Sequence, residues 1–139
     1  MLVIGYSVIA CNYLKIYLII YYIVMNTNHD VYLSSAAKLA FKSDNNKHKH
    51  GCIIINNKGH IISQGINRNY KNNPFLTVHA EQDALLSIDK KKLKKYKCLF
   101  MYVVRIKNTD INKLKLSKPC DSCQRKILKF PNIKYIYYS

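Results

Sequence analysis

The chain opens with a long apolar run and then changes to short apolar blocks separated by polar turns. Residues Met1–Val24 are almost entirely hydrophobic, with Asn12 and Lys15 as polar interruptions in the middle of the run. A helix of this length is about long enough to span a bilayer, since roughly 20 apolar residues are needed. Three interpretations of this segment are open: a membrane anchor, an upstream extension that is not translated, or a segment packed in a partner interface.

The positive charge of the chain lies almost wholly after this segment. An anchor would therefore leave the rest of the chain on the cytosolic side of the membrane. The apolar run has no basic stretch before it and no small-residue cleavage site after it, which argues against a secretory signal. We therefore expect a hydrophobic segment, 1–24, and a single domain, 25–139, in the cytoplasm.

After Met25 the apolar positions change between helical and strand-like spacing. Apolar side chains recur at helical intervals in Asn28–Lys42 and after His79. The near-continuous apolar run Cys98–Ile106 predicts a central strand covered on both faces. The predicted order is helix Asn28–Lys42, strands Cys52–Ile55 and His60–Ile66, a helix from His79, strand Cys98–Ile106, a polar loop Lys107–Leu116, helix Cys120–Phe130 and strand Ile133–Tyr138. This order predicts a three-layer α/β/α fold with a mixed sheet of about four strands.

Two short motifs carry the candidate chemistry. The first is His79-x-Glu81, and the second, further along the chain, is Pro119-Cys120-x-x-Cys123. One imidazole and two thiolates suit zinc and leave the fourth position of a tetrahedral site open. Zinc in such a site lowers the pKa of its bound water to about 7 and so supplies a hydrolytic nucleophile at neutral pH. Glu81 lies two residues from His79, where it can act as a general base and then as a general acid.

The spacing of the two cysteines fits a metal site at the start of a helix. Cys123 falls about one helical turn after Cys120, so both thiolates can face one ion. Pro119 fits just ahead of a helix start, and the helix N-terminus favours the thiolate. A redox pair and a closed structural zinc site are the alternatives. The closed site needs a fourth ligand. Cys98 is a candidate for it, although its place at the start of an apolar run is more typical of a core thiol.

Composition shows that the chain is strongly positive, and its cysteines indicate the redox state of its compartment. Lys and Arg number 23 against 7 for Asp and Glu, a net charge of +16. This charge suits a polyanionic partner such as nucleotide phosphate or nucleic acid, although a bias toward A/T-rich codons would also raise the lysine content. His48 and His50 are candidate contacts to substrate phosphate or metal, although two histidines in a basic loop are usually only solvated. Arg105 is either a phosphate contact or a charge at a strand end, and Lys90–Lys97 is more typical of a solvated face. Five cysteines, an odd number with two in a metal pattern, favour a reducing compartment.

From about residue 29 to the C-terminus the chain resembles the cytidine and deoxycytidylate deaminase superfamily. The order of elements, the Gly65-Ile66-Asn67 segment and the two metal motifs carry the resemblance. It implies a cytidine-deaminase-like fold and a single catalytic zinc ion. The site residues that it implies are His79, Cys120 and Cys123 as zinc ligands, Glu81 as the proton shuttle, Asn67 as a contact to the sugar or base, and the Ala80 backbone as the reader of the pyrimidine edge.

Two departures from the family pattern bear on substrate and assembly. Members that act on tRNA adenosine commonly have Glu before the Pro-Cys pair, where this chain has Lys118. The chain also stops at Ser139, without the fifth strand that is usual in this fold. The resulting open sheet edge predicts a homo-oligomer.

The sequence therefore predicts a zinc-dependent hydrolase. Its substrate is a small molecule, a cytosine nucleoside or nucleotide of the CMP/dCMP type, whose exocyclic amine becomes a carbonyl with release of ammonia. One alternative is a deaminase acting on a cytosine or adenine base within RNA or DNA, with Tyr70 and Phe75 as stacking candidates. The other is a non-catalytic zinc-stabilised module. The presence of Glu81 argues against that module, because a structural site has no use for a carboxylate at its open position.

Overall fold

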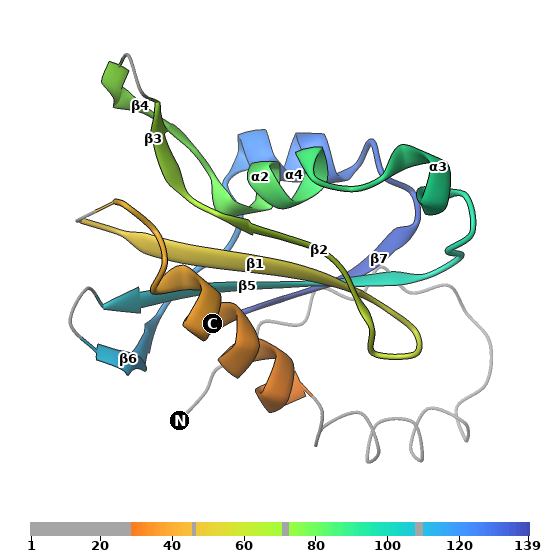
Figure 1. Ribbon diagram of the computed structural model, residues 1–139, viewed down its shortest axis with the longest axis horizontal. Helices are drawn as coiled ribbons and strands as arrows, with labels where there is room; N and C mark the ends of the chain where they lie inside the picture. The colour runs from red at the N-terminus through yellow and green to blue at the C-terminus, as the bar shows by residue number, and fades with distance from the viewer. Residues whose placement is uncertain (1–28, 46, 71–72, 108–109) are drawn as a thin grey trace.

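The computed structural model describes residues 29–45, 47–70, 73–107 and 110–139 (Figure 1). The hydrophobic segment 1–24, a membrane-anchor candidate, lies outside the described residues. Within the described ranges, no helix is both long enough and apolar enough to cross a membrane.

A five-stranded mixed sheet forms the centre of the domain. Its strands are β1 (Lys49–Asn56), β2 (Ile61–Ile66), β5 (Leu99–Lys107), β6 (Asp110–Lys115) and β7 (Ile133–Tyr138). The order is β2-β1-β5-β6, and β7 also pairs with β5, in parallel. The first half of β5 pairs with β7 and its end pairs with β6, so these two strands share one edge of β5. The central position predicted for the strand at 98–106 is confirmed.

Helices cover both faces of the sheet, as Figure 1 shows. The alternation of side chains along β1 and β5 sends them into two separate apolar clusters. On one face, Ile53 and Tyr102 pack against the helix of residues 29–40. On the other, Ile54 and Met101 pack in the same cluster as α2 (Ala80–Leu86) and α4 (Asp121–Ile127). The predicted three-layer α/β/α class is confirmed, but within the described residues the sheet has five strands where about four were predicted.

Two glycines allow these helices to approach the sheet closely. A Cβ at Gly51 would lie 2.1 Å from the carbonyl oxygen of Ala36, and one at Gly65 would lie 2.3 Å from that of Ala80. Backbone atoms can clear such distances only if the whole helix shifts, so only glycine fits without displacing it. Gly65 thereby fixes the start of α2 against β2.

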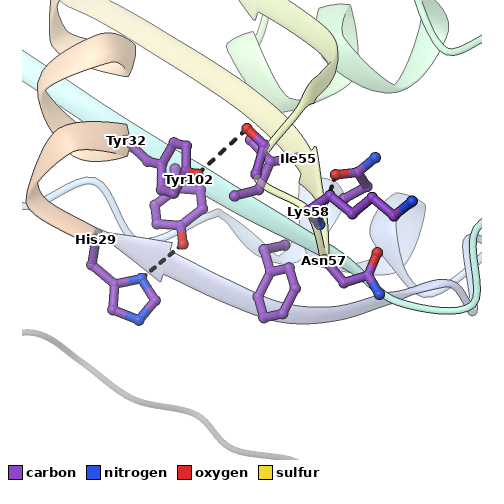
Figure 2. Close-up of a pocket in the computed structure, with 9 residues that line it drawn as sticks. His29, Tyr32, Ile55, Asn57, Lys58 and Tyr102 are labelled. Atoms are coloured by element: carbon purple, nitrogen blue, oxygen red, sulfur yellow. Dashed lines mark hydrogen bonds between the residues drawn. The ribbon is translucent and has the colours of Figure 1, made fainter. Parts of the chain in front are cut away.

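An aromatic cluster lies under the helix of residues 29–40. The Nδ1 atom of His29 is hydrogen-bonded to the hydroxyl of Tyr102 at 2.7 Å, and the His29 ring lies 4.1 Å from that of Tyr137. His29 and Tyr102 border a pocket of about 170 Å³ beside the β1–β2 turn (Figure 2). Because Tyr102 points away from α2 and α4, this pocket is on the opposite face of the sheet from both helices.

The sequence prediction missed several small elements. Residues 107–116 were predicted as a loop, and this was wrong, because β6 forms there. A two-stranded ribbon, β3 (Arg68–Tyr70) with β4 (Asn73–Val78), precedes α2, and the short helix α3 (Lys90–Leu93) follows it. β3 is exposed throughout and α3 has no buried residue, so neither has the apolar pattern on which such predictions depend.

Candidate metal centre and its pocket

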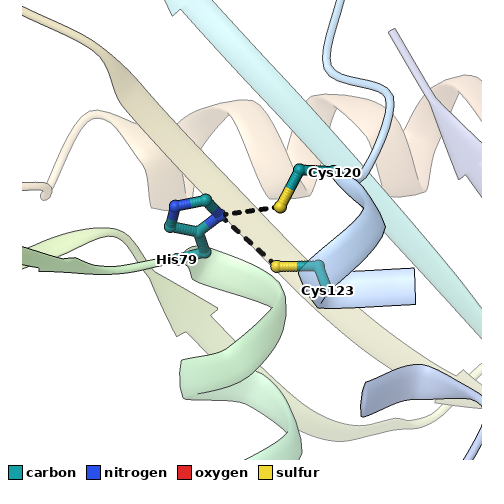
Figure 3. A group of neighbouring side chains, drawn as sticks. All are labelled: His79, Cys120 and Cys123. Atoms are coloured by element: carbon teal, nitrogen blue, oxygen red, sulfur yellow. Dashed lines mark hydrogen bonds between the residues drawn. The ribbon is translucent and has the colours of Figure 1, made fainter. Parts of the chain in front are cut away.

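The starts of two helices bring the predicted zinc ligands together (Figure 3). His79 is the N-cap residue of α2, Cys120 is the N-cap residue of α4, and Cys123 lies in the first turn of α4. The His79 Nδ1 atom lies 3.6 Å from the Cys120 sulfur and 3.3 Å from the Cys123 sulfur. One ligand atom from each residue falls within 4.8 Å of the others.

This donor set fits a zinc ion. With zinc–nitrogen and zinc–sulfur bonds of about 2.0–2.3 Å, two ligands of a tetrahedral site lie roughly 3.5 Å apart. The observed separations of 3.3 and 3.6 Å match that spacing. Cys98 does not belong to the group and instead packs against the cluster under the helix of residues 29–40, as expected for a core thiol. The three residues would leave one position open.

Side-chain hydrogen bonds hold the two ligand-bearing helices in place. Asp83, in the first turn of α2, accepts hydrogen bonds from the backbone N–H of Ile66 at 3.0 Å and from Arg68 at 2.8 Å. Lys126 of α4 donates to Gln82 of α2 at 2.7 Å. These contacts fix α2 to β2 and join it to α4, so the separation of the ligands is set by the fold.

A pocket of about 370 Å³ opens beside the ligand cluster. Its lining residues come from the 45–50 segment, the residue after β2, β4, the end of β5, the segment after β6 and the two helix starts; they are Asn45, His48, His50, Asn67, Thr77, His79, Glu81, Arg105, Leu116, Ser117, Lys118 and Cys120. The Glu81 side chain is buried, with 5% exposed. Burial raises the pKa of the Glu81 carboxyl above its usual value. The candidate proton-transfer group and the ligand cluster therefore share one pocket.

Asn67 and Ala80, the two candidate substrate contacts, lie in different settings. Asn67 is 4% exposed, and its amide oxygen accepts hydrogen bonds from Ser43 and from the His50 backbone, both at 2.7 Å. Its amide nitrogen donates to the His48 carbonyl, which occupies one of its two hydrogens. Ala80 is fully buried as the first residue of α2, where backbone N–H groups have no partner within the helix.

One wall of the pocket is basic. Arg105 donates a hydrogen bond of 2.6 Å to His48 Nδ1, and Lys118 lines the same pocket. Burial, followed by the charge of Arg105, lowers the pKa of His50 to about 4, and the same two causes lower the pKa of His48. Both histidines are therefore neutral at pH 7. Arg105 and Lys118 carry the positive charge of the lining, and Glu81 is the one carboxylate among its described residues.

A pair of serines braces this wall, and sequence analysis missed it. The Ser117 hydroxyl donates to the Val103 carbonyl at 2.8 Å, and the Ser117 backbone N–H donates to the Ser139 carbonyl at 2.7 Å. The Ser139 hydroxyl donates to the Lys115 carbonyl at 2.7 Å. These bonds tie the segment before Cys120 to β5 and the end of β7. No sequence pattern distinguishes these two serines from surface serines.

Fold and site together define an α/β protein with a histidine–dicysteine metal-binding group between two helix starts. Residues 26–139 match the family described as the cytidine and deoxycytidylate deaminase zinc-binding region, and the chain belongs to this family. The family resemblance inferred from the sequence is confirmed, and with it the general class of zinc-dependent deaminases.

Solved structures agree on the fold. The apo dCMP deaminase of cyanophage S-TIM5 is 24% identical, with a TM-score of 0.58 over 81% of this chain and 82% of that chain. A cytidine deaminase from Burkholderia pseudomallei is 19% identical, with a TM-score of 0.53 over 75% and 77% of the two chains. A mutant form of the Mycobacterium tuberculosis cytidine deaminase is 14% identical, with a TM-score of 0.51 over 77% and 80%. A search of curated proteins found no match.

Proposed function

We propose that this protein deaminates a cytosine nucleotide of the CMP/dCMP type by hydrolysis, converting the exocyclic amine to a carbonyl and releasing ammonia. Family membership supports the reaction class. The observation that carries the choice of a nucleotide is the basic wall of the pocket, where Arg105 and Lys118 supply the charge and Arg105 is hydrogen-bonded to neutral His48.

In this proposal His79, Cys120 and Cys123 hold one zinc ion. A zinc ion bound there would supply Lewis-acid activation of water at neutral pH. The protein's part is to fix the three donors at the helix starts, beside the pocket that would hold the substrate.

Glu81 moves the protons. It takes a proton from the attacking water and passes it to the ring nitrogen beside the amine. It then takes the proton of the newly added hydroxyl, which becomes the carbonyl, and gives it to the amine, which leaves as ammonia. A raised pKa favours both steps, because a carboxyl closer to neutral pH can accept and return a proton in one cycle. Its burial beside His79 supports this role.

The Ala80 backbone and the Asn67 side chain would contact the substrate. The Ala80 backbone N–H at the helix start would donate to the pyrimidine carbonyl. Asn67 has one amide hydrogen beyond the bond to His48, and this hydrogen would donate to a sugar hydroxyl. Both roles follow from the family resemblance.

The basic wall would hold the 5′-phosphate. The guanidinium of Arg105 suits a phosphate because it can donate two parallel hydrogen bonds, and neutral His48 can turn its donor toward the same anion. A related structure supports a monophosphate, because the cyanophage S-TIM5 dCMP deaminase, 22% identical to this chain, was solved in complex with dCMP and dUMP.

Ammonia release from a substrate panel tests the proposal. The zinc-loaded full chain is assayed with cytidine, deoxycytidine, CMP, dCMP, adenosine and a single-stranded oligonucleotide. We expect turnover of CMP or dCMP to exceed that of the matching nucleoside. Activity on the oligonucleotide alone would show that the substrate is a base within a polynucleotide. If zinc-loaded protein released ammonia from none of these substrates, the proposal that the protein is a deaminase would be contradicted.

Arg105→Gln separates phosphate recognition from chemistry. Losing a charged hydrogen bond of about 1.5–3 kcal/mol should raise KM for the monophosphate roughly 10- to 100-fold with little change in kcat. Turnover of the nucleoside should stay as in the wild type. Arg125→Gln is the matched control, since Arg125 is exposed on α4 and does not line the pocket. An equal loss on nucleoside and nucleotide would show that Arg105 does not read the phosphate.

A further inference from the structure

The segment after α2 presents a fixed group of lysines, which we call the lysine platform: Lys90, Lys91, Lys92, Lys94, Lys95 and Lys97. All six are exposed. The platform begins after α2 ends, whereas His79 caps the start of that helix. Figure 1 shows α3 beyond the C-terminal end of α2, away from the metal centre. The platform is therefore a surface separate from the proposed active site.

The backbone under the platform is held in place. Leu93 and Tyr96 pack against the apolar cluster of α2 and α4. Asn132, just before β7, donates its amide to the carbonyls of both Leu93 and Tyr96. Asp89 caps α3 by accepting from the Lys91 N–H at 2.9 Å. The lysines consequently project from an ordered turn, which the sequence pattern alone does not indicate.

The charge on the platform is poorly compensated. Asp89–Lys97 contains six lysines and one aspartate, a net charge of +5. That aspartate lies 3.8 Å from Lys92, and both side chains are largely exposed. Like charges held within a Debye length of about 8–10 Å repel one another. Binding a polyanion would relieve this repulsion and release the polyanion's counterions.

We propose that the lysine platform binds single-stranded nucleic acid. Its ammonium groups would contact successive phosphates. Tyr96 stays partly exposed between Lys95 and Lys97, and its ring would stack on a base. Aromatic rings set among cations are the combination that binds single strands without sequence preference. This activity goes beyond the proposed deamination of a monomer.

Fluorescence anisotropy with a labelled 20-nucleotide DNA or RNA strand tests the proposal across a salt series. The test variant of the full chain is Lys91→Gln/Lys94→Gln/Lys95→Gln, which keeps the Lys92–Asp89 pair. The control is Lys38→Gln/Lys42→Gln/Lys58→Gln, which removes the same charge from exposed lysines elsewhere. Thermal unfolding and deamination of the monomer substrate are measured for both variants, to confirm folding and to keep this test independent of the proposed function.

We expect the platform variant to bind at least about tenfold more weakly and to reduce the slope of log K against log salt by about 2, at roughly 0.7 for each phosphate that is no longer neutralised. The control should stay within about threefold of the wild type in the same salt series. Equal losses in the two variants would attribute binding to overall charge and overturn the proposal. Wild-type binding to anionic vesicles but not to the strand would overturn it in favour of a lipid surface.

Discussion

Glu81 is the residue whose replacement best separates chemistry from metal binding. Glu81→Gln keeps the size of the side chain and removes the proton acceptor. We expect kcat to fall by roughly 10²–10⁴ while zinc content and thermal midpoint stay unchanged. Ammonia release and elemental analysis of the purified protein provide the measurements.

His79→Ala is the companion variant for this measurement. It removes a proposed ligand and should lose zinc together with activity. If Glu81→Gln also lost its zinc, Glu81 would have a structural role and the proposed proton transfer would be wrong.

Single residues also mark the limit of prediction from the sequence. The family motifs named His79, Glu81, Cys120 and Cys123. The structure places the first three on one pocket and puts the Cys123 sulfur 3.3 Å from His79 Nδ1. Ser117 could not be found in this way, because its role depends on Val103 and Ser139, which are remote in sequence and reach it only through the sheet.

Gly51 and Gly65 form a matched pair for testing how the layers position the site. Gly65→Ala would push α2 away from β2, and because α2 starts at His79, both stability and zinc affinity should fall. Gly51→Ala would displace the helix of residues 29–40 and should lower stability alone. The expected destabilisation is about 1–3 kcal/mol for each.

Urea unfolding and competition with a chromophoric zinc chelator measure the two effects of these alanine variants. The stability loss should be similar in both. A loss of zinc affinity in Gly51→Ala equal to that in Gly65→Ala would mean that the α2–β2 contact does not position the ligand.

His50, in β1, should make the stability of the folded protein depend on pH. The pKa of His50 is lowered to about 4 in the folded protein, mainly by burial, from a usual value near 6.5. The unfolded chain therefore binds more protons between these values, so stability rises with pH across that window and falls as the pH drops from 6.5 toward 4. His50→Gln should remove up to about 3 kcal/mol of this dependence.

Urea unfolding at pH 7 and at pH 5 in the presence of EDTA measures this effect without contributions from bound metal. Lowered pKa values of His29 and His48 act in the same direction, so part of the slope should survive in His50→Gln. An unchanged slope in His50→Gln would show that His50 is not responsible.

The main elements could be predicted because each buries a face. Helix 29–40, β1, β5 and α2 have apolar positions at the periods that their burial requires. β6 could not, because it is a short polar strand that pairs only with the end of β5. The β3–β4 ribbon was not predicted for a similar reason, since β3 is exposed along its whole length.

Metal removal should lower the stability of the whole domain. Anything that binds only the folded state stabilises it, by about 4 kcal/mol at a concentration 1,000 times its Kd. EDTA should therefore lower the thermal midpoint of zinc-loaded protein by about 10 °C or more. His79→Ala should show no EDTA effect, and an EDTA effect of equal size in that variant would place the stabilising metal elsewhere. Differential scanning calorimetry provides the measurement.

The position of the ligands on two separate helix starts also has a topological consequence. His79 and Cys120 are 41 residues apart in the chain. The stretch between them contains β5, the central strand of the sheet. An ion bound to both would close this stretch into a ring, and closing a ring of that size costs a free chain about 3 kcal/mol of conformational entropy. A chain that bound the metal before folding would already have lost this conformational entropy. It would then form its sheet with the central segment tethered at both ends.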